Sequence, residues 1–231
     1  LLAGPGSDAW RERWVDADAA HAAVVEGSES FCEGRILADV VDLAPDPSTV
    51  FVSNSMPVRD LDRFGAPTTA SLTALGNRGA SGIDGIVSTA LGAGSATTDD
   101  LTLGAGDLAY YHDMNGLVAL QRCDVDATIV LLNNDGGGIF HMRPIESYDP
   151  TFTAQFVTPH GLDFEPTGDL YDLSFARVEG EDRDAFREAY TEATASEGSH
   201  VIEVQTDAAA SHQVRERLRE RAVDRVLDAT T

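Results

Sequence analysis

Residues 101–107 read LTLGAGD, and residues 128–138 read TIVLLNNDGGG. Each stretch begins with an apolar run of strand length and ends in glycines beside a polar side chain, Asp107 in the first and Asn134 in the second. Residues 101–103 predict a short strand, and the run at 128–132 is typical of a strand buried on both faces, as in a parallel sheet. The two stretches therefore predict parallel strands with polar residues just beyond their carboxyl ends.

The alternation of strand and helix patterns continues along the chain. Further strands are predicted at 50–53, 174–178 and 201–204, and helices at 83–91, 114–118, 186–193 and 208–227. Such alternation predicts an α/β fold, with a doubly wound, mainly parallel sheet and helices on both faces. In such sheets ligands bind beyond the carboxyl ends of the strands, so the segments that follow the strands are the candidate site.

Composition excludes two classes of partner. The chain has 231 residues, with 39 Asp and Glu against 16 Lys and Arg, a formal net charge of −23, and every basic residue is an arginine. A protein that binds nucleic acid or an anionic membrane needs a basic face, which this balance argues against. The hydrophobic fraction of 42% is enough for a sizeable core. We interpret the acidic residues as a solvated surface adapted to concentrated salt, as in a halophile.

Three further patterns bound the setting of the protein. Cys32 and Cys123 stand apart without metal-ligand spacing, which predicts two buried thiols in a reduced compartment. The longest uninterrupted apolar run, residues 127–132, is too short for a membrane span. The start of the chain has no signal-peptide pattern, so we expect a cytoplasmic protein without a membrane span.

The domain organisation follows from the same patterns. Residues 1–30 precede the first strand and read as a linker with one helix, or as the tail of a preceding central domain. Residues 31–231 form the α/β domain. Because the chain opens at LLAGP without an initiator Met, we expect it to be a piece of a longer protein.

The glycines of the first stretch allow two interpretations. Residues 104–109 satisfy the dinucleotide pattern GxGxx[GA]. However, Asp107 would then place a carboxylate against a pyrophosphate, and Asp124 and Asp126 precede the next strand instead of following it. The dinucleotide interpretation is therefore the weaker one.

A bound cation is the alternative. Asn134 follows Asp107 by 27 residues, which fits one helix and one strand, so both side chains would lie at neighbouring strand ends. A carboxylate and an amide oxygen, completed by a diphosphate and water, are typical ligands of Mg²⁺. Glycine-rich turns can offer backbone N–H groups to the phosphates. The structural alternative is that both residues only cap helices.

Four segments together resemble a known family. They are NSMPVR at 54–59, NRGASGIDG at 77–85, GDL at 106–108 and NNDGGGIF at 133–140. The last two resemble the diphosphate-binding motif of thiamine diphosphate (ThDP) enzymes. The complete set, in this order, resembles the MenD family of 2-succinyl-5-enolpyruvyl-6-hydroxy-3-cyclohexene-1-carboxylate synthases of menaquinone biosynthesis. The resemblance covers roughly residues 30 to 205 and implies the diphosphate-binding domain of the ThDP fold.

The resemblance also implies roles for individual residues. The side chains of Asp107 and Asn134 and the carbonyl of Gly136 would ligate Mg²⁺, with Mn²⁺ as the alternative metal. Ile83 would hold the cofactor in its bent conformation. The residues implied to bind the cofactor are Gly106, Asp107, Leu108, Asn134, Gly136, Gly137, Ile139 and Phe140. Ser55, Arg59 and Arg78 would hold substrate carboxylates, a task that suits the planar fork of arginine.

The reaction implied by the resemblance is the decarboxylation of 2-oxoglutarate, followed by addition of the succinyl carbanion equivalent to isochorismate. The glutamate that activates the cofactor belongs to a pyrimidine-binding domain, which this chain lacks and which a second subunit normally supplies. We therefore expect a homo-oligomer and an isolated chain that is inactive. The alternatives are another ThDP-dependent 2-oxoacid decarboxylase, an acetolactate synthase, or a non-catalytic subunit that retains the fold.

Other candidate residues have weaker support. His112, His141 and His160 lie near the motifs and invite an acid–base role, which we weight toward His141. Arg143, in the same segment as His141, is a further candidate for substrate contact. The arginines of residues 215–221 alternate with acidic residues, which predicts a solvated, ion-paired helix face. The proline-rich stretch 144–167 predicts a long irregular excursion.

Overall fold

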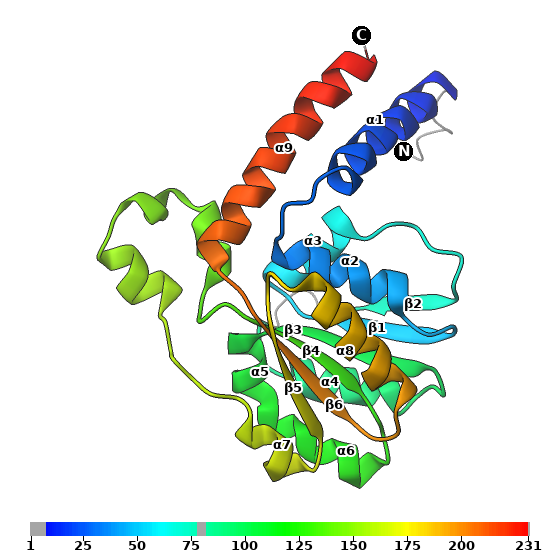
Figure 1. Ribbon diagram of the computed structural model, residues 1–231, viewed down its shortest axis with the longest axis vertical. Coiled ribbons are helices and arrows are strands. Elements are labelled where there is room, and N and C mark those ends of the chain that lie inside the picture. The colour runs from blue at the N-terminus through cyan, green and yellow to red at the C-terminus, as the bar shows by residue number, and fades with distance from the viewer. Residues whose placement is uncertain (1–7, 78–81, 231) are drawn as a thin grey trace, which may run out of the picture.

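The structure is a computed structural model that describes residues 8–77 and 82–230. Within these residues, six strands form one sheet in the order β2-β1-β3-β4-β6-β5 (Figure 1). The strands are β1 (Ser48–Val52), β2 (Leu72–Leu75), β3 (Asp100–Gly106), β4 (Thr128–Asn133), β5 (Ser174–Glu179) and β6 (His200–Gln205). Every neighbouring pair is parallel, which confirms the predicted α/β architecture.

Helices connect the strands. The α-helices are α1 (Asp8–Glu26), α2 (Glu33–Leu43), α3 (Met56–Phe64), α4 (Ile86–Gly94), α5 (Asp107–Asp113), α6 (Val118–Cys123), α7 (Pro166–Tyr171), α8 (Arg183–Ala195) and α9 (Ala208–Thr230). Short helical turns are η1 (Met114–Leu117), η2 (Gly138–Met142), η3 (Pro144–Ser147) and η4 (Thr153–Val157). The predicted excursion at 144–167 holds only such short turns before α7, so it is largely irregular as expected.

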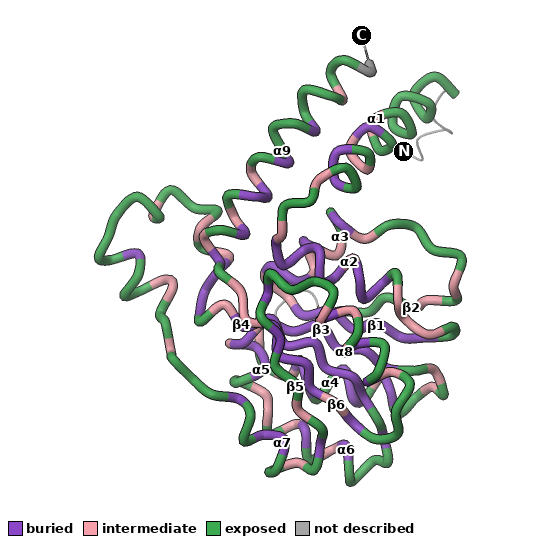
Figure 2. The backbone as a smooth tube through the Cα atoms, viewed as in Figure 1, coloured by how far each residue is buried: buried purple, intermediate pink, exposed green. Residues whose placement is uncertain are grey.

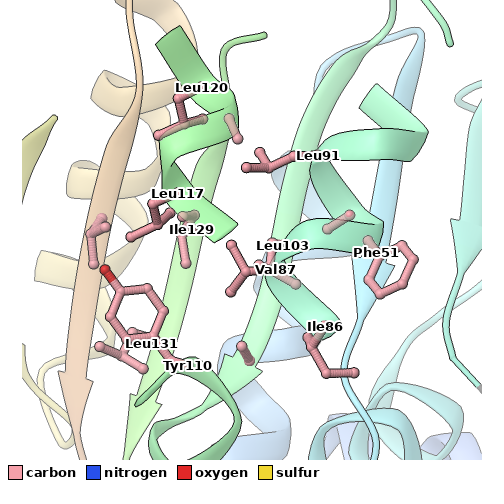
Figure 3. Close-up of a cluster of buried hydrophobic side chains, with 14 of the residues drawn as sticks. Phe51, Ile86, Val87, Leu91, Leu103, Tyr110, Leu117, Leu120, Ile129 and Leu131 are labelled. Carbon is pink, nitrogen blue, oxygen red and sulfur yellow. The ribbon is translucent and has the colours of Figure 1, made fainter. Parts of the chain in front are cut away.

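Both faces of the sheet are covered, because side chains alternate along each strand. Leu103, Ile129 and Leu131 lie in one cluster with apolar residues of α4, α5 and α6, as Figure 3 shows. Their neighbours Val130 and Leu132 point to the opposite face and pack with α2 and α8. This two-sided burial is the reason why the central strands have no polar alternation.

The strand order places the site. From β1 the chain first goes outward to β2 and then returns to β3 on the other side of β1. Such a reversal leaves a crevice beyond the carboxyl ends of the two strands that flank it. Here these ends are joined by the backbone N–H of Ser53, which donates to the carbonyl of Gly104 at 2.8 Å. The residues after β1 and β3 therefore line this crevice.

Helices α1 and α9 extend together from one end of the domain (Figure 1). Their contact buries Val24 and Val25 of α1 with Val214, Leu218 and Ala222 of α9. Figure 2 shows buried residues along the central strands and exposed residues along the outer turns of both helices. None of the helices in the described part of the chain is long and apolar enough to span a membrane.

Two expectations from the sequence were wrong or incomplete. Cys32 is buried, but Cys123 at the end of α6 is exposed, so the prediction of two buried thiols was wrong for Cys123. Strand β2 was not predicted. It is an edge strand whose residues are only partly buried or exposed, so its sequence lacks the apolar run that marks the central strands.

Candidate functional site

Two polar residues meet at the ends of neighbouring strands. Asp107 is the first residue of α5, directly after β3, and Asn134 follows β4. Gly106 of β3 pairs with Leu132 of β4, so Asp107 lies one residue and Asn134 two residues beyond this last pair. The backbone N–H of Asn134 donates to Asp107 Oδ2 at 3.2 Å. The structure thus brings together the two residues that the spacing of 27 residues selects.

The Asp107 carboxylate is held by backbone donors. Oδ1 accepts from the N–H of Leu108 at 2.6 Å, and Oδ2 accepts from the N–H of Gly136 at 2.9 Å. Asp107 is only 2% exposed. Burial raises the pKa of Asp107, and the hydrogen bonds from Gly136 and Leu108 oppose that shift. A nearby cation would favour the ionised form of this buried group.

The Asn134 amide is oriented by a carboxylate. Asn134 Nδ2 donates to Glu33 Oε1 at 2.7 Å. Asn134 Oδ1 is buried and accepts no hydrogen bond from any residue that the structure describes. A buried oxygen without a donor is costly, so a bound group that accepts its lone pair would stabilise the site. This orphaned oxygen beside Asp107 fits an oxygen-coordinated cation such as Mg²⁺.

The turn after Asn134 needs glycine for space. Gly136 has φ 140°, and a Cβ there would lie 2.1 Å from the carbonyl oxygen of Val157. A Cβ on Gly138 would lie 2.8 Å from Asn134 Nδ2 and would displace the amide. The Gly136 carbonyl accepts from the N–H of Gly138 at 3.0 Å, and its second lone pair remains available as a ligand.

A cavity of about 270 Å³ lies over these residues. Its lining comes from the segments after β1, β2, β3 and β4 and from the start of α2. The predicted site residues among the lining are Ser55, Ile83, Gly106, Asp107, Leu108, Asn134, Gly136, Gly137, Ile139 and Phe140. Arg59 donates to the Ser55 carbonyl instead of lining this cavity. Arg78 lies outside the described residues.

The segment after β1 is strained at Ser55. This residue precedes α3 with φ 71° and ψ −128°, a region that residues with side chains rarely occupy. The preceding Asn54 donates from Nδ2 to the carbonyl of Gly82 at 2.7 Å. That bond holds the segment after β1 against the segment that carries Ile83. The segment with Ser55, predicted to bind substrate, is therefore adjacent to the segment with Ile83, predicted to support the cofactor.

Residues 63–204 match the family model described as thiamine pyrophosphate enzyme, C-terminal TPP binding domain. The chain belongs to this family. Thiamine pyrophosphate is the same compound as ThDP, so membership agrees with the ThDP-binding fold expected from the motifs. Asp107, Asn134 and the glycine turn all lie within the matched residues.

Relatives with curated names share much of this TPP-binding domain. The chain is 62% identical to the 2-succinyl-5-enolpyruvyl-6-hydroxy-3-cyclohexene-1-carboxylate synthase of Haloquadratum walsbyi, over 97% of this chain and 42% of the relative. It is 63% identical to the synthase of the same name from Haloarcula marismortui, over 93% of this chain and 36% of the relative. The chain thus spans about two fifths of the length of these relatives. Their origin in halophilic archaea agrees with the salt-adapted composition.

Solved structures support the fold. The benzoylformate decarboxylase of Polynucleobacter necessarius matches 78% of this chain and 34% of its own, with a TM-score of 0.62 at 18% identity. The ThDP-dependent 4-hydroxybenzoylformate decarboxylase of Rhodococcus jostii RHA1 matches with a TM-score of 0.57 at 19% identity. At this identity the likeness concerns the architecture of the domain and not its substrate.

The TPP-binding domain places the candidate histidines differently from the prediction. His160, given less weight than His141, directs Nε2 to Asp107 Oδ2 at 3.2 Å. His141 instead pairs its Nδ1 with Glu146 Oε1 at 2.8 Å and packs against the Phe152 ring. Sequence gave little signal for His160, because it lies in the irregular excursion, whose path no periodicity defines. Arg143 is exposed.

Two charged residues of the site were missed or misjudged. Glu33, at the start of α2, lines the cavity and had no motif to mark it. Arg215 of α9 is only 5% exposed and pairs with Glu33 and with Asp60 of α3. The prediction of a solvated helix face for 215–221 was therefore wrong at Arg215. It holds at Arg219, which is exposed and pairs with Glu216 on the same helix.

Proposed function

We propose that this chain is the ThDP- and Mg²⁺-binding C-terminal part of a MenD-type synthase, in which residues 31–231 are the diphosphate-binding domain and residues 1–30 the link to preceding parts. One observation carries the proposal. The chain is 62–63% identical, over more than nine tenths of its length, to synthases of that name.

The cation site is proposed at the ends of β3 and β4. The carboxylate of Asp107, the amide oxygen of Asn134 and the carbonyl of Gly136 would supply three hard oxygen ligands. The unpartnered Asn134 Oδ1 supports this assignment. A diphosphate and water would complete the shell of Mg²⁺ or Mn²⁺. Across the described residues no group of three or more His, Cys, Asp and Glu could hold a metal, which is consistent with a ligand set that has one carboxylate.

The cavity residues would position the cofactor. Bound ThDP supplies an electron sink for the carbanion formed on decarboxylation. Ile83 is partly buried, packs against the apolar cluster under the cavity and would support the bent cofactor from below. The backbone of Gly106, Leu108 and Gly137 would face the diphosphate, whereas Ile139 and Phe140 would exclude water from the reacting end.

Substrate recognition is proposed at the mouth of the cavity. Ser55, Arg59 and Arg78 would bind the carboxylates of 2-oxoglutarate and isochorismate, because an arginine fork matches a carboxylate with two parallel hydrogen bonds. Arg59 is partly buried on the first turns of α3, beside the strained Ser55. In a chain of net charge −23, arginines that bind the substrate would provide the local positive potential that acidic substrates require.

A second domain would complete the active site. The two carboxylates that line the cavity already have other roles: Asp107 is the proposed cation ligand, and Glu33 accepts hydrogen bonds from Asn134 and Arg215. The glutamate that activates the aminopyrimidine is therefore proposed to come from a pyrimidine-binding domain, supplied by a second subunit of a homo-oligomer. The relatives leave more than half of their length for such parts.

The test is an assay of the assembled enzyme, this chain together with its pyrimidine-binding domain, in molar KCl. We expect CO₂ release from 2-oxoglutarate to require ThDP and a divalent cation, and the adduct to form only with isochorismate. Asp107→Ala should abolish cation-dependent ThDP binding by calorimetry. Asp113→Asn, at the far end of α5, is the matched control and should bind normally. CO₂ release without adduct formation would indicate a plain decarboxylase instead.

A further inference from the structure

A chain of buried polar contacts runs from α9 to the cavity wall. Arg215 Nε donates to Asp60 Oδ1 at 2.8 Å, and its Nη2 donates to Asp60 Oδ2 and to Glu33 Oε2. Glu33 Oε1 then accepts from Asn134 Nδ2 at 2.7 Å and from Thr206 Oγ1 at 2.9 Å. Asp60, Glu33 and Arg215 are 0%, 1% and 5% exposed. Residues from α3, α9 and α2 thus converge on one side chain of the candidate cation site.

These buried contacts determine which way the Asn134 amide points. An ionised carboxylate only accepts hydrogen bonds, so the side of the amide that faces Glu33 must be the NH₂ group. The amide oxygen must then face the opposite direction, where it lies buried beside the cavity with no described donor. Glu33 therefore leaves the hard oxygen ligand of Asn134 free for another partner.

We propose that Glu33 is a positioning residue for cation binding: it fixes the Asn134 amide with its oxygen toward the metal, and Arg215 with Asp60 fixes Glu33. The proposal rests on the cation site of the proposed function. A water in place of Glu33 could donate as well as accept, and would allow the amide to turn its NH₂ group toward the cation. The carboxylate removes that choice, as residues behind metal ligands commonly do.

Arg215 makes a buried glutamate tolerable at this position. A buried carboxylate without a paired charge is costly, and Arg215 supplies the paired charge for Glu33. The guanidinium forms charge-assisted bonds to both Glu33 and Asp60, so the group of three carries a net charge of −1 if all are ionised. That residual negative charge also favours a cation at the adjoining ligand.

The first test is Glu33→Gln in the assembled enzyme. The glutamine oxygen is expected to turn toward Arg215, where a charge-assisted bond forms, and the glutamine NH₂ then faces Asn134. The Asn134 amide must rotate and present NH₂ to the cation. We expect the affinity for Mn²⁺ at saturating ThDP to fall roughly 10- to 100-fold. The probe is Mn²⁺ itself, and its free concentration is measured from its electron paramagnetic resonance signal.

The decisive variant reverses the polarity of the contact. In Glu33→Gln with Asn134→Asp, the glutamine NH₂ donates to one carboxylate oxygen and leaves the other for the cation, while the summed charge of the pair is unchanged. We expect Mn²⁺ affinity to return to within about threefold of wild type. Asn134→Asp alone sets two carboxylates against each other and should not bind better than wild type. A merely structural role for Glu33 would not produce this rescue.

A matched control separates orientation from the loss of a buried charge. Asp39, on the same helix α2, is fully buried and pairs with Arg183 and Arg187 away from the cavity. Asp39→Asn should lower the denaturation midpoint yet leave Mn²⁺ affinity unchanged.

The outcomes are distinguishable. If Asn134→Ala loses Mn²⁺ binding but Glu33→Gln retains it, the positioning role is overturned while the cation site stands. If neither variant changes Mn²⁺ binding, the proposed cation site itself is wrong. If Glu33→Gln loses binding and the double variant fails to restore it, Glu33 acts only as structural support and the proposal is overturned.

Discussion

The backbone N–H of His160 donates a hydrogen bond of 2.9 Å to Asp135 Oδ1, and the same oxygen accepts from the N–H of Gly161 at 2.7 Å. Asp135 belongs to the turn after β4, at φ 59°. One side chain therefore fastens the irregular excursion to the glycine turn of the site. Held there, the His160 ring directs Nε2 to Asp107 Oδ2 at 3.2 Å.

We predict that Asp135→Gly releases this loop. Glycine tolerates the positive φ, so the variant removes the acceptor without adding backbone strain. The amides of His160 and Gly161 should lose hydrogen-exchange protection equivalent to about 1–2 kcal/mol. Asp135→Asn keeps a carbonyl oxygen and adopts the same backbone conformation readily, so it should retain most of the protection. Equal exchange in the glycine variant and wild type would show that the loop is held by other contacts.

The location of the site follows from short-range patterns. Apolar runs that end in Asp107 and Asn134 predict two adjacent strands, and parallel pairing then forces their ends together. Nothing beyond the strand period and the spacing is needed for that step. The same reasoning explains why the glycines after Asn134 could be singled out, since a turn at a crowded strand end needs residues without Cβ.

The support of the site could not be found in this way. Arg215 and Glu33 are separated by 182 positions in the chain, and their contact depends on where α9 lies relative to α2. Local charge alternation on α9 suits a solvated face equally well, because the pattern cannot tell which side another element covers. His160 lies in an irregular segment, where neither period nor propensity defines the path. Long-range packing, which sequence periodicity does not encode, determines where Arg215, Glu33 and His160 lie.

We predict that Asp60 makes the free energy of unfolding depend on pH. Burial raises the pKa of Asp60 from 3.8 to about 6, against the opposing effect of Arg215. Between these pH values the folded protein holds a proton that the unfolded chain has released. Raising the pH through this window therefore lowers the free energy of unfolding, by roughly 3 kcal/mol for this shift.

Asp60→Asn does not titrate and isolates the effect. The difference in free energy of unfolding, variant minus wild type, should move in favour of the variant as the pH rises from 4 to 6.5 and stay level above. A constant difference between the neutral Asp60 side chain and asparagine shifts the whole curve without changing its shape. Chemical denaturation in molar KCl measures the free energy of unfolding of both proteins at each pH. The difference for Asp60→Ala should change with pH in the same way. A difference that is flat with pH would contradict the raised pKa.

The last prediction contrasts two glycines. A methyl group on Gly136 would meet the Val157 carbonyl oxygen at 2.1 Å, and its φ of 140° is unfavourable for any residue with a side chain. We expect Gly136→Ala to cost about 2 kcal/mol or more and to weaken cation-dependent ThDP binding, because the Gly136 N–H that donates to Asp107 must shift.

Gly92, inside α4, has open space around its missing Cβ. Gly92→Ala should therefore stabilise the protein by roughly 0.5–1 kcal/mol through helix propensity and leave ThDP binding unchanged. Denaturation midpoints and calorimetry on both variants check the pair. Equal stability of the two variants would mean that the turn after β4 yields to the added methyl group, and its backbone could not then be the rigid frame that Asp107 requires.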